Sequence, residues 1–279
     1  GVFAIESPRH NLGRGFFNIR PLAHESSVNK RVLIMDESKS VEIENFPDSE
    51  RKAVYRAIYE RRDIRHFRTD PIPDDVLARI IQAAHHGPSV GFMQPWDFIL
   101  IKNPQIREQA KALFERERQA ASCFYDEPRR SQYLSLKLEG IMEAPVSVCV
   151  TCDYTRADEV LGRNAIPETD VYSTCCAIQN LWLAARCEGI GVGWVSILRP
   201  RQLRNILGIP AHVLPVAYLC LGYPTQFYEQ PMLASAGWRE RQPVDSLIHL
   251  DGWSGEPGSG WDNFLDALGN ATPSKTEPI

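Results

Sequence analysis

The stretch Glu60-Arg-Arg-Asp-Ile-Arg-His-Phe67 places three arginines within five positions around a single carboxylate, Asp63. Guanidinium groups bind phosphate through paired, charge-assisted hydrogen bonds, so Arg61, Arg62 and Arg65 are candidates for a phosphate site. The alternative is a solvated helix terminus, where cations interact favourably with the helix dipole. The residues of this stretch alone leave both interpretations open.

A second stretch, Gly87-Pro-Ser-Val-Gly-Phe-Met-Gln-Pro-Trp96, is a turn-rich loop without a charged residue, directly before an apolar strand expected at 97–101. Ser89 and the backbone amides around Gly91 are suited to hydrogen-bond a planar heteroaromatic ring, and Gln94 adds a directed amide. The alternative is a tight connection between a helix and a strand, with Trp96 in the core. Both remain open at this point.

Two further segments carry possible ligand contacts. Residues 237–243 place Arg239 and Arg241 on a bend, where they either join the first arginine cluster on one phosphate or form a polar surface turn. Residues 189–194 are rich in glycine but end a helix and open a strand, the reverse of a dinucleotide fingerprint. Gly193 is expected to let the backbone approach a ligand closely. Ser196 follows three residues later, so only a local bend brings both residues to one ligand.

The composition of the 279-residue chain is that of a globular protein, with 43% hydrophobic and 24% charged residues. Its net charge of −4 argues against a general nucleic-acid binder. No apolar run approaches the roughly 18 residues needed to cross a bilayer, and the first residues lack the order of a secretion signal. Strand alternation separates Cys149 from Cys152, so no metal site is expected, and seven cysteines favour a reducing cytoplasm.

Helical and strand periodicities alternate along the chain, which predicts a layered α/β or α+β domain. We expect an N-terminal extension of uncertain order at 1–46 with one strand-like piece at 31–35, a single domain at 47–253, and a polar tail at 254–279. Within the domain, helices are expected from about 48 to 61, 74–86, 104–123, 132–143, 171–188 and 201–207. Strands are expected at 97–101, 146–152, 191–197 and 214–221.

In this order, these segments resemble the nitroreductase-like flavoprotein superfamily over about residues 50–253. Several stretches are similar to its dimethylbenzimidazole synthase branch: 88–96, Ser-Leu-Lys-Leu-Glu-Gly at 135–140, Cys-Val-Thr-Cys-Asp at 149–153, Gln-Asn-Leu-Trp-Leu-Ala-Ala at 179–185 and Gly-Val-Gly-Trp-Val-Ser at 191–196. Asp63 stands where ordinary nitroreductases carry a small neutral residue, and Phe92 where they often offer Asn. Both departures match the branch.

The resemblance implies a nitroreductase-like α+β fold, with a central mixed sheet flanked by helices, in an intertwined homodimer that binds FMN at the subunit interface. Arg61, Arg62 and Arg65, assisted by Arg239 and Arg241, are then expected at the phosphate and ribityl end. Pro88 and Ser89 would come from the facing subunit, and Leu138 from a helical lid. The full set of expected flavin-binding residues is Arg61, Arg62, Asp63, Ile64, Arg65, Pro88, Ser89, Gly91, Leu138, Gly193, Ser196, Arg239 and Arg241.

The activity that this resemblance implies is the oxygen-dependent fragmentation of reduced FMN to 5,6-dimethylbenzimidazole and erythrose 4-phosphate, which supplies the lower ligand of cobalamin. FMNH2 would be consumed as a substrate, supplied by a separate flavin reductase or by reduction in situ. Asp63 is the expected general base and Ser196 a hydrogen-bonding partner of the flavin. The alternatives are an NAD(P)H-dependent FMN reductase or nitroreductase, and a flavin-binding protein without activity.

Overall fold

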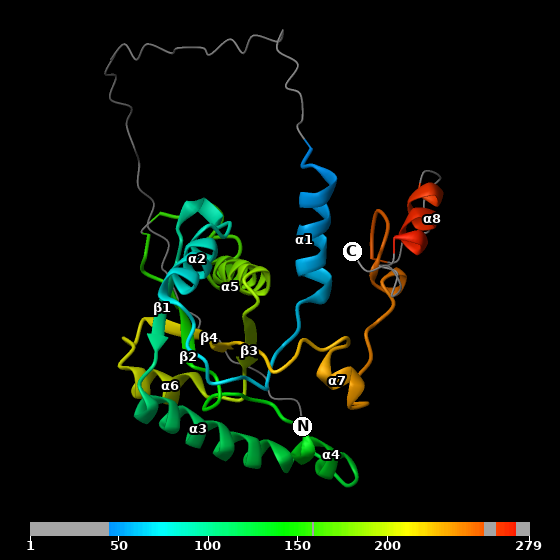
Figure 1. Cartoon of the computed structure of the whole chain (residues 1–279). Helices are drawn as coiled ribbons and strands as arrows, with labels where there is room; N and C mark the ends of the chain where they lie inside the picture. The colour runs from blue at the N-terminus through cyan, green and yellow to red at the C-terminus, as the bar shows by residue number, and fades with distance from the viewer. Residues whose placement is uncertain (1–44, 158, 254–260, 272–279) are drawn as a thin grey trace, which may run out of the picture. The chain divides into compact units, whose positions relative to one another are not determined.

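The computed structural model describes residues 45–157, 159–253 and 261–271 (Figure 1). Its α-helices are α1 (Asp48–Glu60), α2 (Asp74–His85), α3 (Pro104–Ser122), α4 (Arg129–Ser135), α5 (Thr169–Cys187), α6 (Pro200–Leu207), α7 (Met232–Ser235) and α8 (Asp262–Asn270). Its strands are β1 (Trp96–Ile101), β2 (Val146–Asp153), β3 (Gly191–Val195) and β4 (Val213–Gly222), and two short 3-10 helices are η1 (Val90–Phe92) and η2 (Asp245–Leu247). The strands confirm the four sequence-based assignments within a few residues.

The four strands form one antiparallel sheet in the order β1-β2-β4-β3. β2 lies in its interior, and every residue from Val146 to Cys152 is buried. The pairing of β2 with β4 shifts register between Val150 and Thr151, opposite Pro215. Proline has no N–H to donate to the ladder, so an irregularity at that point is expected. In the described part of the chain, the parallel pairing expected of a mixed sheet is limited to one bridge between Asp63 and Val192.

Helices cover both faces of this sheet (Figure 1). On one face, α2 and α5 bury Ile80 and Leu181 against Val148 of β2. On the other face, α3 and α6 bury Phe114 and Leu203 in a cluster that also contains Ile64. A sheet between two helical layers confirms the expected α+β class, and it places the segment after α1 at the edge where β3 runs.

The expected helix at 132–143 is wrong, because α4 ends at Ser135. Arg118 donates to the carbonyl oxygens of Leu134 (2.5 Å) and Leu136 (2.9 Å), so side-chain donors satisfy the carbonyls that a further helical turn would need. Downstream, the buried Glu139 accepts from the Ile141 N–H at 2.7 Å. These contacts favour an irregular path through Leu138.

Two other expectations fall at the ends of the chain. The polar tail expected from residue 254 contains a helix, α8, whose Phe264, Leu265 and Leu268 recur at helical spacing. The extension and the strand-like piece at 31–35 fall almost wholly within residues 1–44, outside the described residues. Among the helices that the structure does describe, none has the length and hydropathy to cross a membrane.

Candidate active site

Asp63 lies directly beside β3. The neighbouring Ile64 N–H donates to the Val192 carbonyl at 2.9 Å, so residues 63–64 run along the strand as a single parallel bridge. The Asp63 Oδ1 accepts from the Trp194 N–H at 2.8 Å. Its Oδ2 accepts from Arg65, and the same Arg65 Nη2 also donates to the Trp194 carbonyl at 2.7 Å. The carboxylate is therefore held by two contacts that both lead to Trp194 of β3. One is the Trp194 N–H itself, and the other is Arg65, which also binds the Trp194 carbonyl.

The surroundings of the Asp63 carboxyl act on its pKa in opposite ways. Burial raises the pKa of Asp63 above its ordinary value, against the opposing effects of Arg65, the Trp194 N–H and Arg61. The side chain keeps 44% of its surface accessible, whereas that of Arg65 keeps 9%. Neighbouring protein atoms thus surround the carboxyl closely enough to raise its pKa, while part of its surface remains accessible to a ligand.

The β3 glycines make room for this segment rather than for a ligand. A Cβ on Gly193 would lie 2.1 Å from the Ile64 carbonyl oxygen and 2.8 Å from Arg65 Nη1. A Cβ on Gly191 would meet the Ile64 side chain at 2.9 Å. The expected close approach at Gly193 is therefore real, but its partner is the protein's own backbone. Ile64 itself is fully buried, and its main chain contacts β3 through the Val192 carbonyl and Gly193.

The three arginines of the segment have different surroundings. Arg65 is buried and committed to Asp63 and Trp194. Arg62 Nη1 donates to the Tyr59 and Arg61 carbonyls, and its Nη2 donates to the Glu229 carbonyl at 2.5 Å. Arg61 lies over the Trp182 ring, 5.0 Å from the centroid. Arg61 is thus the arginine of this segment least engaged by the described part of the protein.

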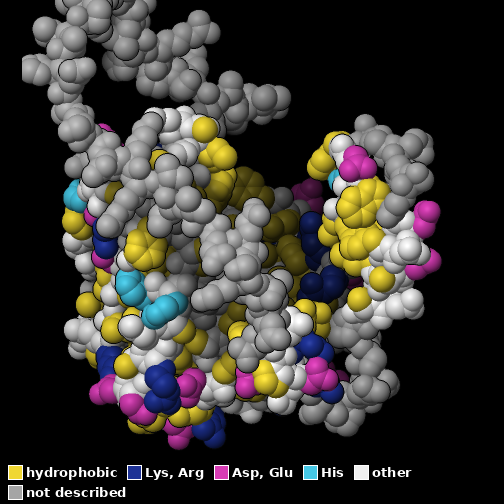
Figure 2. Space-filling view, turned by 90° about the horizontal axis from the view of Figure 1, so that it is seen from above, with side chains coloured by type: hydrophobic (Ala, Val, Ile, Leu, Met, Phe, Trp, Pro, Cys, Tyr) yellow, Lys and Arg dark blue, Asp and Glu magenta, His cyan; other side chains and the backbone are white. Residues whose placement is uncertain are grey.

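Positive charge accumulates around Arg62. Burial lowers the pKa of the Arg62 guanidinium, and the charges of Arg61, Arg241 and Arg186 lower it further, while Glu60 opposes them. Arg241 is thereby close enough to act on the same point as the first cluster, as the sequence suggested. Figure 2 shows Lys and Arg side chains gathered in a hollow on one face of the molecule. Excess positive charge of this kind attracts an anion.

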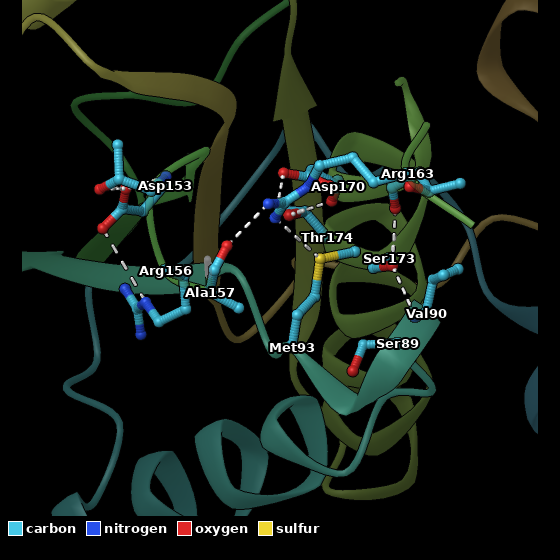
Figure 3. Close-up of polar contacts among 12 residues, drawn as sticks. Ser89, Val90, Met93, Asp153, Arg156, Ala157, Arg163, Asp170, Ser173 and Thr174 are labelled. Carbon is cyan, nitrogen blue, oxygen red and sulfur yellow. Dashed lines mark hydrogen bonds and ion pairs between the residues drawn. The ribbon is translucent and has the colours of Figure 1, made fainter. Parts of the chain in front are cut away.

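The loop at 87–95 is hydrogen-bonded to the beginning of α5 at Ser173 (Figure 3). The arginine segment instead contacts Trp182, in the second half of the same helix. The Val90 N–H donates to Ser173 Oγ at 3.2 Å, and Ser89 Oγ accepts from the Gln94 N–H at 3.2 Å. The backbone has positive φ at Gly91, Phe92 and Gln94, which is strained for the two residues that carry side chains. Nearby, Arg163 pairs with the buried Asp170 at 3.0 Å. The alternative expectation for Trp96 is met, since it lies in the core.

The remaining expected residues are more scattered. Ser196 is exposed and lies one residue beyond β3, Leu138 is half-buried against the α3 face of the core, and Arg239 is exposed. Ser173 and Trp182, which mark the contacts of the loop and of the arginine segment, are separated by about 13 Å along α5 at 1.5 Å per residue. Within one chain, α5 therefore separates Pro88, Ser89 and Gly91 from the arginines.

Sequence reasoning missed four residues that build this region. Trp182 donates from Nε1 to the Arg62 carbonyl at 3.3 Å, and Trp194 binds Asp63 and Arg65 through its main chain. The Glu229 carbonyl accepts from Arg62. The guanidinium carbon of Arg186 lies 4.1 Å from the ring centroid of Phe227. All of these contacts except that of Phe227 involve a main-chain group, and all join residues far apart in sequence, so residue type and spacing carry no signal of them.

Cys149 and Cys152 lie in β2, which β4 separates from β3 and the Asp63 segment. Cys149 belongs to the core on the α3 face, whereas Cys152 contacts Thr174 of α5, so the two lie on opposite faces of β2 as alternation predicted. Burial raises the pKa of both thiols, that of Cys149 to about 12 and that of Cys152 to about 11. Both are therefore inert at neutral pH.

Comparison with known proteins identifies the family. The model of the nitroreductase family matches residues 58–223. The 5,6-dimethylbenzimidazole synthase of Rhodospirillum rubrum is 44% identical over 66% of this chain and 87% of its own length. That of Rhodobacter capsulatus is 38% identical over 72% and 98%. A crystal structure of oxidized iodotyrosine deiodinase bound to FMN and 3-iodo-L-tyrosine matches with a TM-score of 0.57 at 18% identity, over 72% of this chain and 100% of that one. That last likeness shows the fold alone. The family model and the two sequence relatives establish that the chain belongs to the nitroreductase family.

Proposed function

We propose that this protein is a 5,6-dimethylbenzimidazole synthase, which fragments reduced FMN with dioxygen to 5,6-dimethylbenzimidazole and erythrose 4-phosphate. The observation that carries the proposal is the Asp63 carboxylate, held by Trp194 and Arg65 in the same short segment as Arg61 and Arg62. Similarity to two proteins with this name, one at 44% identity, supports it.

The residues present fit FMN at its anionic end. Arg62 Nε and Arg65 Nη1 are buried donors without a hydrogen-bond partner in the described part of the protein. Buried donors without a hydrogen-bond partner cost free energy. A phosphate could accept hydrogen bonds from these donors or from other nitrogens of the same guanidinium groups. In this proposal, Arg61 and Arg62 bind the phosphate, with Arg241 and Arg239 adding charge. Arg65 then serves mainly to orient Asp63.

Reduced FMN would supply the electrons and the carbon atoms of the product, and dioxygen would be the oxidant. The contribution of Asp63 is to accept a proton from the ribityl chain as a general base. Its oxygen atoms are fixed by the Trp194 N–H and by Arg65, so it needs little reorganisation to do so. Ser196, at the end of β3, is proposed to hydrogen-bond the flavin.

The same proposal makes the protein a homodimer with composite sites. The loop at 87–95 and the arginine segment contact different parts of α5, so a second copy is needed to bring them to one flavin. Helix α1 exposes four large apolar side chains that a partner would bury: Val54, Tyr55, Ile58 and Tyr59. All seven cysteines are free, which supports a reducing, cytoplasmic setting. Reduced flavin would be supplied by a separate reductase or by reduction in situ.

Product formation tests the function directly. Purified protein is given excess FMNH2 under air, and dimethylbenzimidazole and erythrose 4-phosphate are measured by chromatography and mass spectrometry. A parallel assay follows NAD(P)H oxidation with FMN and a nitroaromatic acceptor. Equimolar formation of the two products supports the proposal. Turnover of NAD(P)H without them would instead make the protein an FMN reductase or nitroreductase. Flavin binding without either reaction would make it a binding protein.

A further inference from the structure

Trp238 ties the segment after α7 to α4 and to the turn between α3 and α4. Its ring stacks on the guanidinium of Arg129, with Cζ 3.5 Å from the ring centroid. Tyr125 meets the same ring edge-on at 5.5 Å between centroids, and Tyr133 lies at 6.1 Å. We call Tyr125, Arg129, Tyr133 and Trp238 the aromatic latch. Stacking of an arginine on tryptophan is among the stronger cation–π contacts.

Main-chain hydrogen bonds reinforce the aromatic latch. Arg129 Nη2 donates to the Trp238 carbonyl at 2.8 Å, and Gln132 Nε2 donates to the Ala236 carbonyl at 3.0 Å. Between these two carbonyls, Gly237 has a φ of 65°, a turn that glycine adopts without strain. The backbone on both sides of Gly237 is therefore fixed to α4, directly before Arg239 and Arg241.

The beginning of the same segment is attached to the arginine cluster. Phe227 lies beneath Arg186, the Tyr228 hydroxyl lies 2.6 Å from His66 Nδ1, and the Glu229 carbonyl accepts from Arg62. Residues 227–238 are thus held at both ends, by the candidate phosphate site and by α4. At the far end, the charge of Arg241 acts on Arg62.

We infer that Trp238 is a positioning residue, which holds Arg239 and Arg241 at the FMN phosphate by anchoring their segment to Arg129. The inference rests on the proposed binding of FMN and adds to it a residue that does not itself touch the ligand. The two arginines are exposed and have long, mobile side chains, so without the aromatic latch their charges would spread over many positions. An anchored backbone reduces that entropy cost.

The test compares the dissociation constants of FMN and riboflavin, measured by quenching of flavin fluorescence. We expect Trp238→Ala to weaken FMN by about 3- to 10-fold more than riboflavin, and this difference to vanish when Arg239 and Arg241 are both Ala, since coupled residues are non-additive. Trp253→Ala removes another tryptophan, which stacks on His249 rather than in the aromatic latch, and should leave the ratio unchanged. Arg129→Gln keeps a polar side chain and should reproduce the effect if Trp238→Ala fails to fold.

Equal weakening of both ligands, or a full effect in the background lacking both arginines, would overturn the inference. Neither result touches the proposed function, which depends on product formation by the unchanged protein. The two outcomes can also separate in the other direction. If Trp238→Ala changes the ratio of the FMN and riboflavin dissociation constants but the unchanged protein forms no product, the proposed function is wrong and the positioning role stands.

Discussion

Asp63 and Arg65 are two positions apart in sequence, yet they attach to opposite main-chain groups of Trp194. Arg65 also donates to the Asp63 carboxylate, which closes a ring of three contacts. The proposed general base, Asp63, must be held with a carboxylate oxygen facing the substrate. Arg65, from the same short segment, helps to hold it there. This arrangement also explains why a basic segment contains a single acid.

Replacing Asp63 with Asn separates its chemistry from its structural contacts. The amide keeps the shape, and its one acceptor oxygen can still accept from the Trp194 N–H, but it gives up the hydrogen bond from Arg65 and cannot accept the ribityl proton. We expect near-normal FMN affinity and a loss of product of about 100- to 10,000-fold, the usual range for a general base. Reduced flavin should still be oxidised by air. Wild-type rates of dimethylbenzimidazole formation at saturating FMNH2 would remove Asp63 from the mechanism.

The pH dependence of product formation should report the same carboxylate. The base form is needed, and burial raises the pKa of Asp63, so activity should fall as pH drops through a value above the roughly 3.9 of an ordinary aspartate. Arg65 lowers that pKa, so Arg65→Gln should move the acidic limb to higher pH. The measurement is a pH profile of both proteins at saturating substrate. A limb at the same pH in both would contradict the assignment.

Arg61 is the best place to test the phosphate. Its guanidinium is stacked on Trp182 rather than committed to the main chain, so Arg61→Ala should disturb the fold little. We expect FMN to weaken by about 1.5–3 kcal/mol, the loss of a charge-assisted hydrogen bond, and riboflavin to change much less. Arg51→Ala, which removes an exposed arginine paired with Asp48, is the matched control. Equal losses for both flavins would make Arg61 structural.

At the scale of the element, β3 depends on glycine for its contact with the segment at 63–65. A Cβ on Gly193 would press on a carbonyl oxygen, which cannot rotate away as a side chain can. Gly193→Ala should therefore cost about 1–3 kcal/mol of unfolding free energy or more, and displace Asp63. Gly252→Ala, with no atom within 4 Å of the added Cβ, is the control. Denaturant unfolding compares the two, and equal stabilities would contradict this packing.

The elements that periodicity predicted well are those with a continuous buried side. In α2, Leu77, Ile80 and Ala84 recur at helical spacing and are all buried. The region after Ser135 was expected to continue as a helix but does not, because Arg118 and Glu139 satisfy main-chain groups there and at the end of α4. Such long-range hydrogen bonds override local propensity and are absent from any local pattern.

The site was predictable to a similar extent. Clustering of Arg61, Arg62 and Asp63 is visible in the sequence, although these residues alone fit a solvated helix terminus as well as a phosphate site. The different contacts of Arg61 and Arg65 are not visible in the sequence, because they depend on which of the two side chains reaches Trp194. The reason for Gly193 was likewise hidden, since the atom that fills its space comes from a residue distant in sequence.

Helix α1 exposes a large apolar surface in a single chain. Ala57 is its one buried residue among the 13, although Val54 and Ile58 lie on an apolar stripe. An unpartnered apolar face on a helix is a liability in water and is normally covered by another protein surface. The strained loop with the exposed Phe92 raises the same question. In the proposed homodimer, a second copy of the chain would cover both surfaces and complete the flavin site.

Charged substitutions on α1 test this assembly. We expect Val54→Asp combined with Ile58→Asp to convert a dimer into a monomer in sedimentation at micromolar concentration, because both side chains are about half exposed in one chain and would be buried in the pair. The monomer should keep its circular dichroism but lose stoichiometric FMN binding, since the loop at 87–95 and the arginine segment would no longer face one flavin. Leu247→Asp, another exposed apolar residue, is the control and should remain dimeric. A monomer that still binds one FMN per chain would show that each site is built from a single copy.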